Sequence, residues 1–246
     1  MTNNNTNNTT TATRADMLDK VRKLLAQAEN VAGTPEADVF NAKAFELIAK
    51  YGIDETAARE QSGRGPAPIE MVEFLITGQY QTQQAALLHV LAKALHCAPL
   101  SDGRIPGRNN QLVYGTTGHI ERLRVLFATL MPQMLAGAAR VRPHQGARVG
   151  TKAYRTSWMR GFAATVDERL TAAENNAATE SEPGTALVLV NDSKRAVAAM
   201  HDEFGGQIKK TVSRVRHDNA AAAAGAAAAR RVNLGQTGLN GRRALG

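Results

Sequence analysis

Residues 34–52 of the chain, TPEADVFNAKAFELIAKYG, predict an amphipathic helix with a clear beginning and end. Thr34-Pro35-Glu36 is a start signal, because it combines a capping hydroxyl, a proline suited to the first helical position and an acid in the first turn. Apolar residues then recur at the three- and four-residue spacing of one helical face, and Tyr51-Gly52 is expected to close the helix. The residues of this face are Ala37, Phe40, Ala44, Leu47 and Ile48.

A second helix is expected immediately before this one. Thr13 or Asp16 offers a cap, and the same apolar spacing follows until the segment from Asn30 to Gly33 ends the helix. Two helices joined by so short a turn make an antiparallel hairpin, whose apolar faces must meet each other or a third element. The apolar residues of the first helix are Met17, Val21, Leu24, Leu25 and Ala28.

Three short motifs lie in this hairpin: KVRKLLAQAE at residues 20–29, PEA at 35–37 and AKAFELIAKYGI at 42–53. Over roughly residues 15–55 the chain resembles the bacterial and phage domain-of-unknown-function family 2786. VYG at 113–115 and SWMRGF at 157–162 are similar to the region that often follows this domain, although Gly118-His119 stands where such relatives tend to have an acid. The resemblance implies an architecture and a bacterial or phage origin, and it implies no reaction.

The remainder of the chain predicts an α+β fold that is mostly helical. The best strand candidate is ALVLV at 186–190, which is short, β-branched and bounded by turn residues. Short extended segments at 100–104 and 111–114 flank a plausible hairpin connection, and residues 69–76 are ambiguous between strand and loop. Helices are expected at 81–97, from about 118 with a kink or fraying at Pro132, at 152–177, from 192 or 193 to 204, and over the Ala run at 220–231.

These patterns divide the chain into five parts. Residues 1–13 are an Asn/Thr-rich tail, expected to be disordered because it has almost no large apolar groups to bury. The other parts are a helical hairpin module at 14–60, a Gly/Pro-rich linker at 61–68, an α+β domain at 69–206 and a basic, partly helical Ala/Gly-rich tail at 207–246.

Composition narrows the classes of protein. The 246 residues include 30 Lys and Arg against 22 Asp and Glu, a net charge of +8, and the excess of cations falls after residue 60. One cysteine, Cys97, excludes an internal disulfide and a Cys-cluster zinc site, and a small buried thiol is the default expectation for it. Without a membrane-spanning stretch or a secretory signal in the sequence, we expect a cytoplasmic protein that does not act at a membrane.

The strongest physical signal is a basic stretch. Between Glu121 and Asp167 there are eight cations and no acid, with Tyr154 and Trp158 interleaved. Such a stretch can neutralise a polyanion and offer rings for stacking, so we expect sequence-independent nucleic-acid binding. The alternatives are that Trp158 is a core residue on the Phe162 face and that the arginines are a solvated surface. The nucleic-acid-binding candidates are Arg140, Arg142, Arg148, Lys152, Tyr154, Arg155 and Arg160.

A turn before the helix at about residue 118 is a candidate anion site. Gly115, Thr116, Thr117 and Gly118 lead from an extended segment into a helix, where free backbone N–H groups and the helix dipole favour an anion. The turn lacks the patterns of a P-loop and of a dinucleotide fold, and an ordinary tight turn with an N-cap explains the same residues.

No residue pattern identifies a catalytic residue, a metal site or a cofactor. His89 and His96 are seven residues apart, whereas a helical zinc pair needs a spacing of four, so we predict no metal site and no cofactor. A Gly-x-Ser-x-Gly elbow is also missing.

Three hypotheses follow for the function. The leading one is a non-enzymatic, nucleic-acid-associated accessory protein whose hairpin docks a protein partner. The second is an enzyme acting on a phosphorylated or nucleic-acid substrate, with the turn as anion site and Asp167, Glu168 or Asp192 as acids. The third is an assembly module that uses the hairpin and the Ala-rich helix as contact surfaces.

Overall fold

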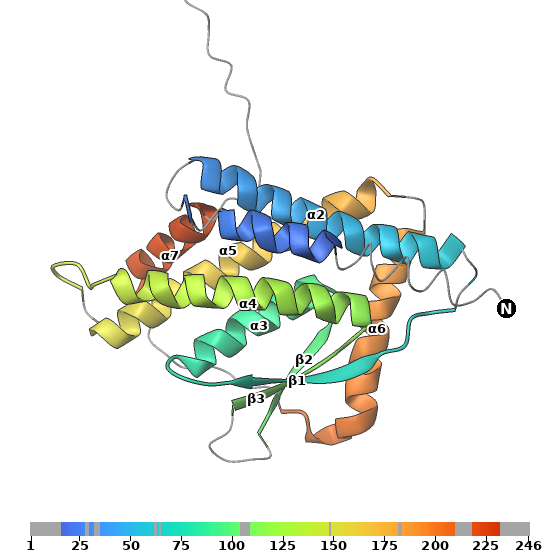
Figure 1. The fold of residues 1–246 in the computed structure, drawn as a ribbon. Helices are drawn as coiled ribbons and strands as arrows, with labels where there is room; N and C mark the ends of the chain where they lie inside the picture. Colours follow the sequence, from blue (N-terminus) through green and yellow to red (C-terminus); the bar gives the residue numbers. More distant parts are fainter. Residues whose placement is uncertain are drawn as a thin grey trace, which may run out of the picture.

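The computed structural model describes residues 16–27, 30–31, 35–61, 63, 65–103, 109–147, 149–181, 184–209 and 218–231 of the 246-residue chain. Helices surround one small antiparallel sheet (Figure 1), which confirms the mostly helical α+β class. The tail at 1–13 lies outside the described residues. Within the described ranges, no helix is both long enough and apolar enough to cross a membrane.

Residues 16–27 form the first helix of the chain. The elements after it are α2 (Pro35–Gln61), β1 (Glu70–Ile76), α3 (Gln81–Ala94), β2 (Ala98–Asp102), β3 (Asn109–Gly115), α4 (Thr117–Arg140), α5 (Thr151–Thr179), α6 (Thr185–Phe204), a 3-10 turn (Gly205–Gln207) and α7 (Asn219–Arg231).

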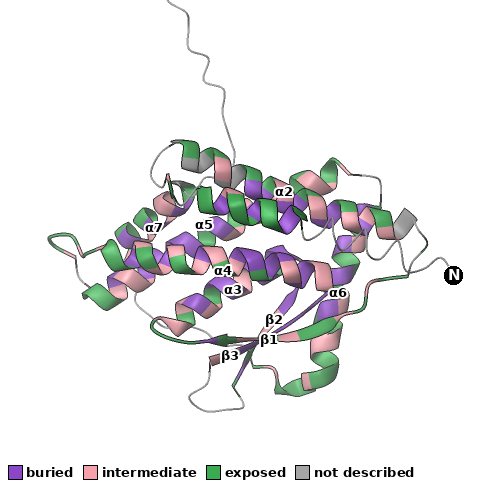
Figure 2. Cartoon of the chain, viewed as in Figure 1, coloured by how far each residue is buried: buried purple, intermediate pink, exposed green. Residues whose placement is uncertain are grey.

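The sheet is sandwiched between helices. Its strand order is β1-β3-β2, and Val113 of the central strand pairs with Val72 of β1 and Pro99 of β2. Successive residues of β3 point to opposite faces. Leu112 and Tyr114 therefore pack against α6, whereas Val113 joins the larger core that also holds α3 and α4. Figure 2 shows that β3 is largely buried, whereas β1 has exposed residues along its length. Residues 104–108, the expected hairpin connection between β2 and β3, lie outside the described residues.

The first helix and α2 lie side by side and bury their apolar faces in the main core. Val21 and Leu25 pack there with Phe45 and Ile48, in the same cluster as residues of α3, α4 and α5. This shared cluster agrees with the expectation that the two apolar faces meet each other or a third element.

The prediction that Tyr51-Gly52 ends the second helix is wrong. α2 continues to Gln61, and its buried face runs on through Gly52, Ile53 and Thr56. A glycine usually signals a helix end because it tolerates a left-handed backbone, but Gly52 stays helical because its missing side chain makes room for another residue, described below.

The prediction of a strand at 186–190 is also wrong, because these residues open α6. The buried positions of α6 are Thr185, Leu189, Asp192 and Ala196, which recur every three or four residues. A short apolar run alone does not distinguish a strand from a helix, and here the polar residues that follow continue the helical spacing.

The Ala-rich helix packs inside the fold rather than outside it. α7 crosses α5 so closely that a Cβ added at Gly161 would meet the backbone of Ala222, and one added at Gly225 would meet that of Trp158. Trp158 stacks on Phe162 with ring centroids 5.7 Å apart, which confirms that it is a core residue.

Candidate functional site

A buried arginine lies at the centre of the molecule. Arg122 of α4 is 1% exposed, and its Nη1 atom donates to Glu174 Oε1 at 2.7 Å and to the backbone oxygen of Ile48 at 3.1 Å. Its Nη2 atom lies 2.9 Å from His119 Nδ1. The guanidinium fits against α2 only because residue 52 is a glycine, since a Cβ there would overlap its Cζ and nitrogen atoms.

Glu174 on α5 balances this charge. Burial by itself raises the pKa of the carboxyl group, but Arg122 and, to a smaller degree, His96 outweigh that effect and hold the pKa below its ordinary value. A buried charge is stable only when it is paired and hydrogen-bonded. Arg122 and Glu174 therefore form a buried ion pair that joins α4 to α5.

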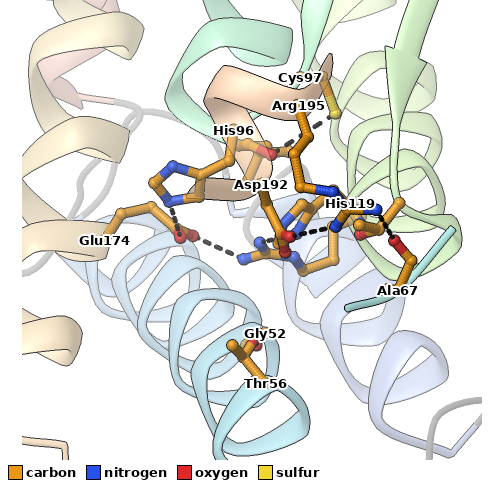
Figure 3. Close-up of polar contacts among 12 residues, drawn as sticks. Gly52, Thr56, Ala67, His96, Cys97, His119, Glu174, Asp192 and Arg195 are labelled. Atoms are coloured by element: carbon orange, nitrogen blue, oxygen red, sulfur yellow. Dashed lines mark hydrogen bonds and ion pairs between the residues drawn. The ribbon is translucent and has the colours of Figure 1, made fainter. Parts of the chain in front are cut away.

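The network continues from Arg122 through His119 to Asp192 and Arg195 of α6, and Figure 3 labels the last three of these residues. His119 is 3% exposed, and its Nε2 atom lies 3.5 Å from Asp192 Oδ2. Arg195 donates to Asp192 Oδ1 at 3.0 Å and to the backbone oxygen of Ala67 at 2.6 Å. Burial, with a contribution from Arg122, lowers the pKa of His119 to about 4, so its imidazole is neutral near pH 7.

His96 approaches the same network from the end of α3. His96 and Cys97 donate backbone hydrogen bonds to Lys93 and Ala92, which is the pattern that closes a helix with a left-handed residue. Glycine usually fills that position, but here it is His96 with a φ of 61°. Its Nε2 atom lies 3.5 Å from Glu174 Oε2, and its ring centroid is 5.5 Å from that of His119.

Cys97 is buried beside these groups, as expected for a small internal thiol. Burial raises the pKa of the thiol to about 12. Because the thiolate is the reactive form of cysteine, Cys97 is not a nucleophile at neutral pH.

A cavity of about 680 Å³ opens where α2, residues 65–68, the start of α4 and α6 meet. His119, Asp192 and Arg195 from the network line it. Its other charged or polar side chains are Glu55, Thr56, Arg59, Thr116, Thr117, Asn191 and Lys194, and its apolar wall includes Pro66, Ala67, Pro68 and Val188.

The predicted anion-binding turn lies at this cavity, but carboxylates of the chain itself surround it. Thr116 caps α4 by accepting from the backbone N–H of His119. Thr117 donates to Glu70 at 2.6 Å, and a Cβ at Gly118 would lie 2.5 Å from Glu55 Oε2. Gly115 packs against Cys97. The positive end of α4 therefore already faces two negative groups, which disfavours an additional phosphate at the turn itself.

The predicted nucleic-acid-binding residues are divided among different environments. Tyr154 is 7% exposed and belongs to the core, so its ring offers no free face for a base. Arg155 donates to the backbone oxygens of Ala139 and Val141 at the end of α4. Arg148 lies outside the described residues. The exposed members of the set are Arg140, Arg142, Lys152 and Arg160.

The histidine pair considered for metal binding does not come together. His89 Nε2–H donates a hydrogen bond to Gln111 Oε1 at 2.7 Å, whereas His96 faces Glu174. Among the described residues, no group of three His, Cys, Asp or Glu side chains is arranged to hold a metal ion.

The sequence did contain a signal for the buried network. Glu174 continues the spacing of four residues that runs through Trp158, Phe162, Val166 and Leu170 on the buried face of α5. Arg122 adjoins Leu123 on the buried face of α4. A carboxylate and a guanidinium at core positions of two helices are the signal in the sequence that indicates this ion pair.

Comparison with known proteins adds a family but no activity. No curated protein matches the chain, and no solved structure does. Residues 16–55 match the model of the family described as "Protein of unknown function (DUF2786)". The match confirms the resemblance carried by the motifs of the first two helices. The amino-terminal segment of the chain therefore carries the signature of the DUF2786 family, whose function is unknown.

Proposed function

We propose that the chain is an enzyme that binds a small organic anion in the cavity between α2, α4 and α6 and transfers a proton there. The observation that carries the proposal is the position of His119. Its Nε2 atom is buried, forms no hydrogen bond within the described part of the chain, and lies 3.5 Å from Asp192 where both residues line the cavity. A buried polar atom without a partner is costly, so it points to a group that arrives with a ligand.

The lining of the cavity supports a ligand with an anionic end and an apolar body. Among the described residues that line the cavity, three cations, Arg59, Lys194 and Arg195, outnumber two acids, Glu55 and Asp192. Prolines and a valine form part of the remaining wall. Small-molecule sites commonly combine an apolar lining with a few converging polar groups, and titratable residues with strongly shifted pKa values are frequent in active sites.

The proposal is tested by ligand-observed NMR with a panel of small carboxylates and phosphate monoesters. We expect a subset to bind, and Asp192→Asn to weaken that binding roughly tenfold, the equivalent of one lost hydrogen bond to a charged group. Asp202→Asn is the matched control, because Asp202 is an exposed carboxylate on the same helix. Absence of binding across the panel, or equal effects of the two variants, contradicts the proposal.

A second candidate is the nucleic-acid-associated cytoplasmic role expected from the basic stretch. The observation that favours it is that Arg140, Arg142, Lys152 and Arg160 are exposed around the end of α4 and the first half of α5, a part of the sequence without acids. Its test is a salt titration of binding to labelled DNA and RNA. We expect the logarithm of the affinity to fall linearly with the logarithm of salt concentration and charge reversal of these four residues to abolish binding. No binding at low salt contradicts it.

A further inference from the structure

The hydrogen bond between Arg122 and His119 has only one chemically consistent direction. A guanidinium carries N–H donors and no acceptor. The Nδ1 atom of His119, 2.9 Å from Arg122 Nη2, must therefore accept. An imidazole that accepts at Nδ1 and is neutral carries its proton on Nε2, the atom that faces Asp192.

Burial and the neighbouring cations favour this neutral form, and they outweigh the two carboxylates near the ring. Arg122, one turn further along α4, donates to Nδ1, and a proton there would clash with that donor. His96 lies against the ring from the end of α3, and its own charge would repel a charged His119. Asp192 on α6 favours the charged form, as does Glu174 on α5 at longer range, but the burial of the ring outweighs them.

We infer that Arg122 is a positioning residue that fixes His119 as the tautomer protonated at Nε2, so that in the cavity His119 donates a hydrogen bond and Asp192 is the base. The consequence for a ligand rests on the proposed function. The 3.5 Å between Nε2 and Oδ2 is too long for a direct hydrogen bond. A hydroxyl group of the ligand, or a water molecule, that sits beside this pair at hydrogen-bond distance from both atoms can accept from Nε2–H and donate to Oδ2.

His119 and Asp192 then define the direction in which a proton moves. The O–H bond of the bridging group breaks, its proton moves to Asp192 Oδ2, and the oxygen that keeps the electron pair stays hydrogen-bonded to His119 Nε2–H. Exchanging the roles would require His119 to accept through Nε2, which the donor at Nδ1 prevents. A hydroxyl-bearing organic anion is therefore the ligand class that this geometry selects.

The first experiment determines the tautomer of His119 by ¹⁵N NMR on the full chain labelled at its histidines. We expect an unprotonated Nδ1 and a protonated Nε2 at neutral pH. In Arg122→Met/Glu174→Gln, which removes both charges of the buried pair, we expect a mixture of tautomers. Arg124→Met is the control, because Arg124 is an exposed cation on the same helix. A proton on Nδ1 of the wild type overturns the inference without any variant being needed.

The second experiment compares ligands that differ by a hydroxyl group, lactate against propionate and glycerol phosphate against propyl phosphate. We expect the hydroxylated member to bind roughly tenfold more tightly, and His119→Leu to remove that preference. Equal binding of both members overturns the inference while leaving the proposed function standing. If none of the four binds, the proposed function fails, and the tautomer measurement alone decides the role of Arg122.

Discussion

Gly52 of α2 packs directly against the guanidinium of Arg122, with no room between them for a methyl group. The two residues belong to helices that are separated by the whole sheet in sequence. Arg122 also donates a hydrogen bond to the backbone oxygen of Ile48, one turn before Gly52. The main chain of α2 therefore contacts the buried guanidinium at both positions. This contact explains why a glycine sits in the interior of a long helix.

Gly52→Ala is expected to destabilise the protein by about 1–3 kcal/mol, since the added methyl group overpacks the site of the guanidinium. In an exposed helix the same change would instead stabilise by about 0.5–1 kcal/mol. The measurement is the free energy of unfolding in urea. Gly103→Ala serves as the control, because a Cβ there would meet nothing within 4 Å. A neutral or stabilising Gly52→Ala would show that the helices can move apart.

Arg122→Met is expected to cost about 3–5 kcal/mol, because it leaves the carboxylate of Glu174 buried without its partner. Arg122→Met/Glu174→Leu removes both charges and should regain a substantial part of that loss, since apolar replacement of a buried pair is often close to neutral. Urea unfolding of the two variants measures the difference. Equal stability of the single and double variants would show that Glu174 finds another partner.

Gly225→Ala is expected to push α7 away from α5, because the obstacle is the backbone of Trp158, which cannot rotate aside as a side chain can. Relative to the wild type, the variant should show faster hydrogen exchange at the amides of α7, with little change at the amides of α4. The neighbouring Ala224→Ser, at an exposed position of the same helix, should leave exchange unchanged. Unaltered protection of α7 in Gly225→Ala would contradict the close crossing.

The protein should lose stability as the pH falls below about 6.5. The pKa of His119 is lowered from 6.5 to about 4 in the folded chain, chiefly by burial. Between pH 6.5 and about 4 the unfolded chain binds a proton at this histidine that the folded chain does not. The free energy of unfolding therefore falls as the pH approaches 4, by roughly 3 kcal/mol in total. Urea unfolding across this range measures it, and His119→Gln should show a shallower dependence. Identical slopes would mean that His119 is not buried as a neutral ring.

Much of the secondary structure followed from apolar spacing, whereas the candidate site did not. The helix at 16–27 has a one-sided apolar pattern that its burial follows, and the apolar residues expected to face inward on α5, from Trp158 to Leu170, are buried. The strand prediction for residues 186–190 was wrong because five consecutive apolar residues fit either period, and the helical spacing becomes visible only when Thr185, Asp192 and Ala196 are included. The prediction that α2 ends at Gly52 was wrong for a related reason, because this glycine makes room for Arg122, 70 positions away in the sequence.

The site itself is formed by residues that come from four helices and the turn after α3, and no local pattern joins them. Arg122 and His119 are neighbours on α4, but their partners Glu174 and Asp192 lie on α5 and α6. Composition counted Arg122 among the free cations of the basic stretch, although it is buried in an ion pair. A count of cations describes the surface only after the cations of such buried pairs have been subtracted.

The DUF2786 match stops at residue 55, while α2 continues to Gln61 and accepts the Arg122 guanidinium at Ile48 and Gly52. The matched segment therefore supplies one side of a contact between two helices. The other side is the Arg122 side chain, on a helix that the family model does not cover. Wherever this segment recurs with a glycine at the equivalent position, we expect a distant helix in the same protein to supply a matching arginine. Searching other proteins that match this family model for the glycine and the arginine tests that expectation.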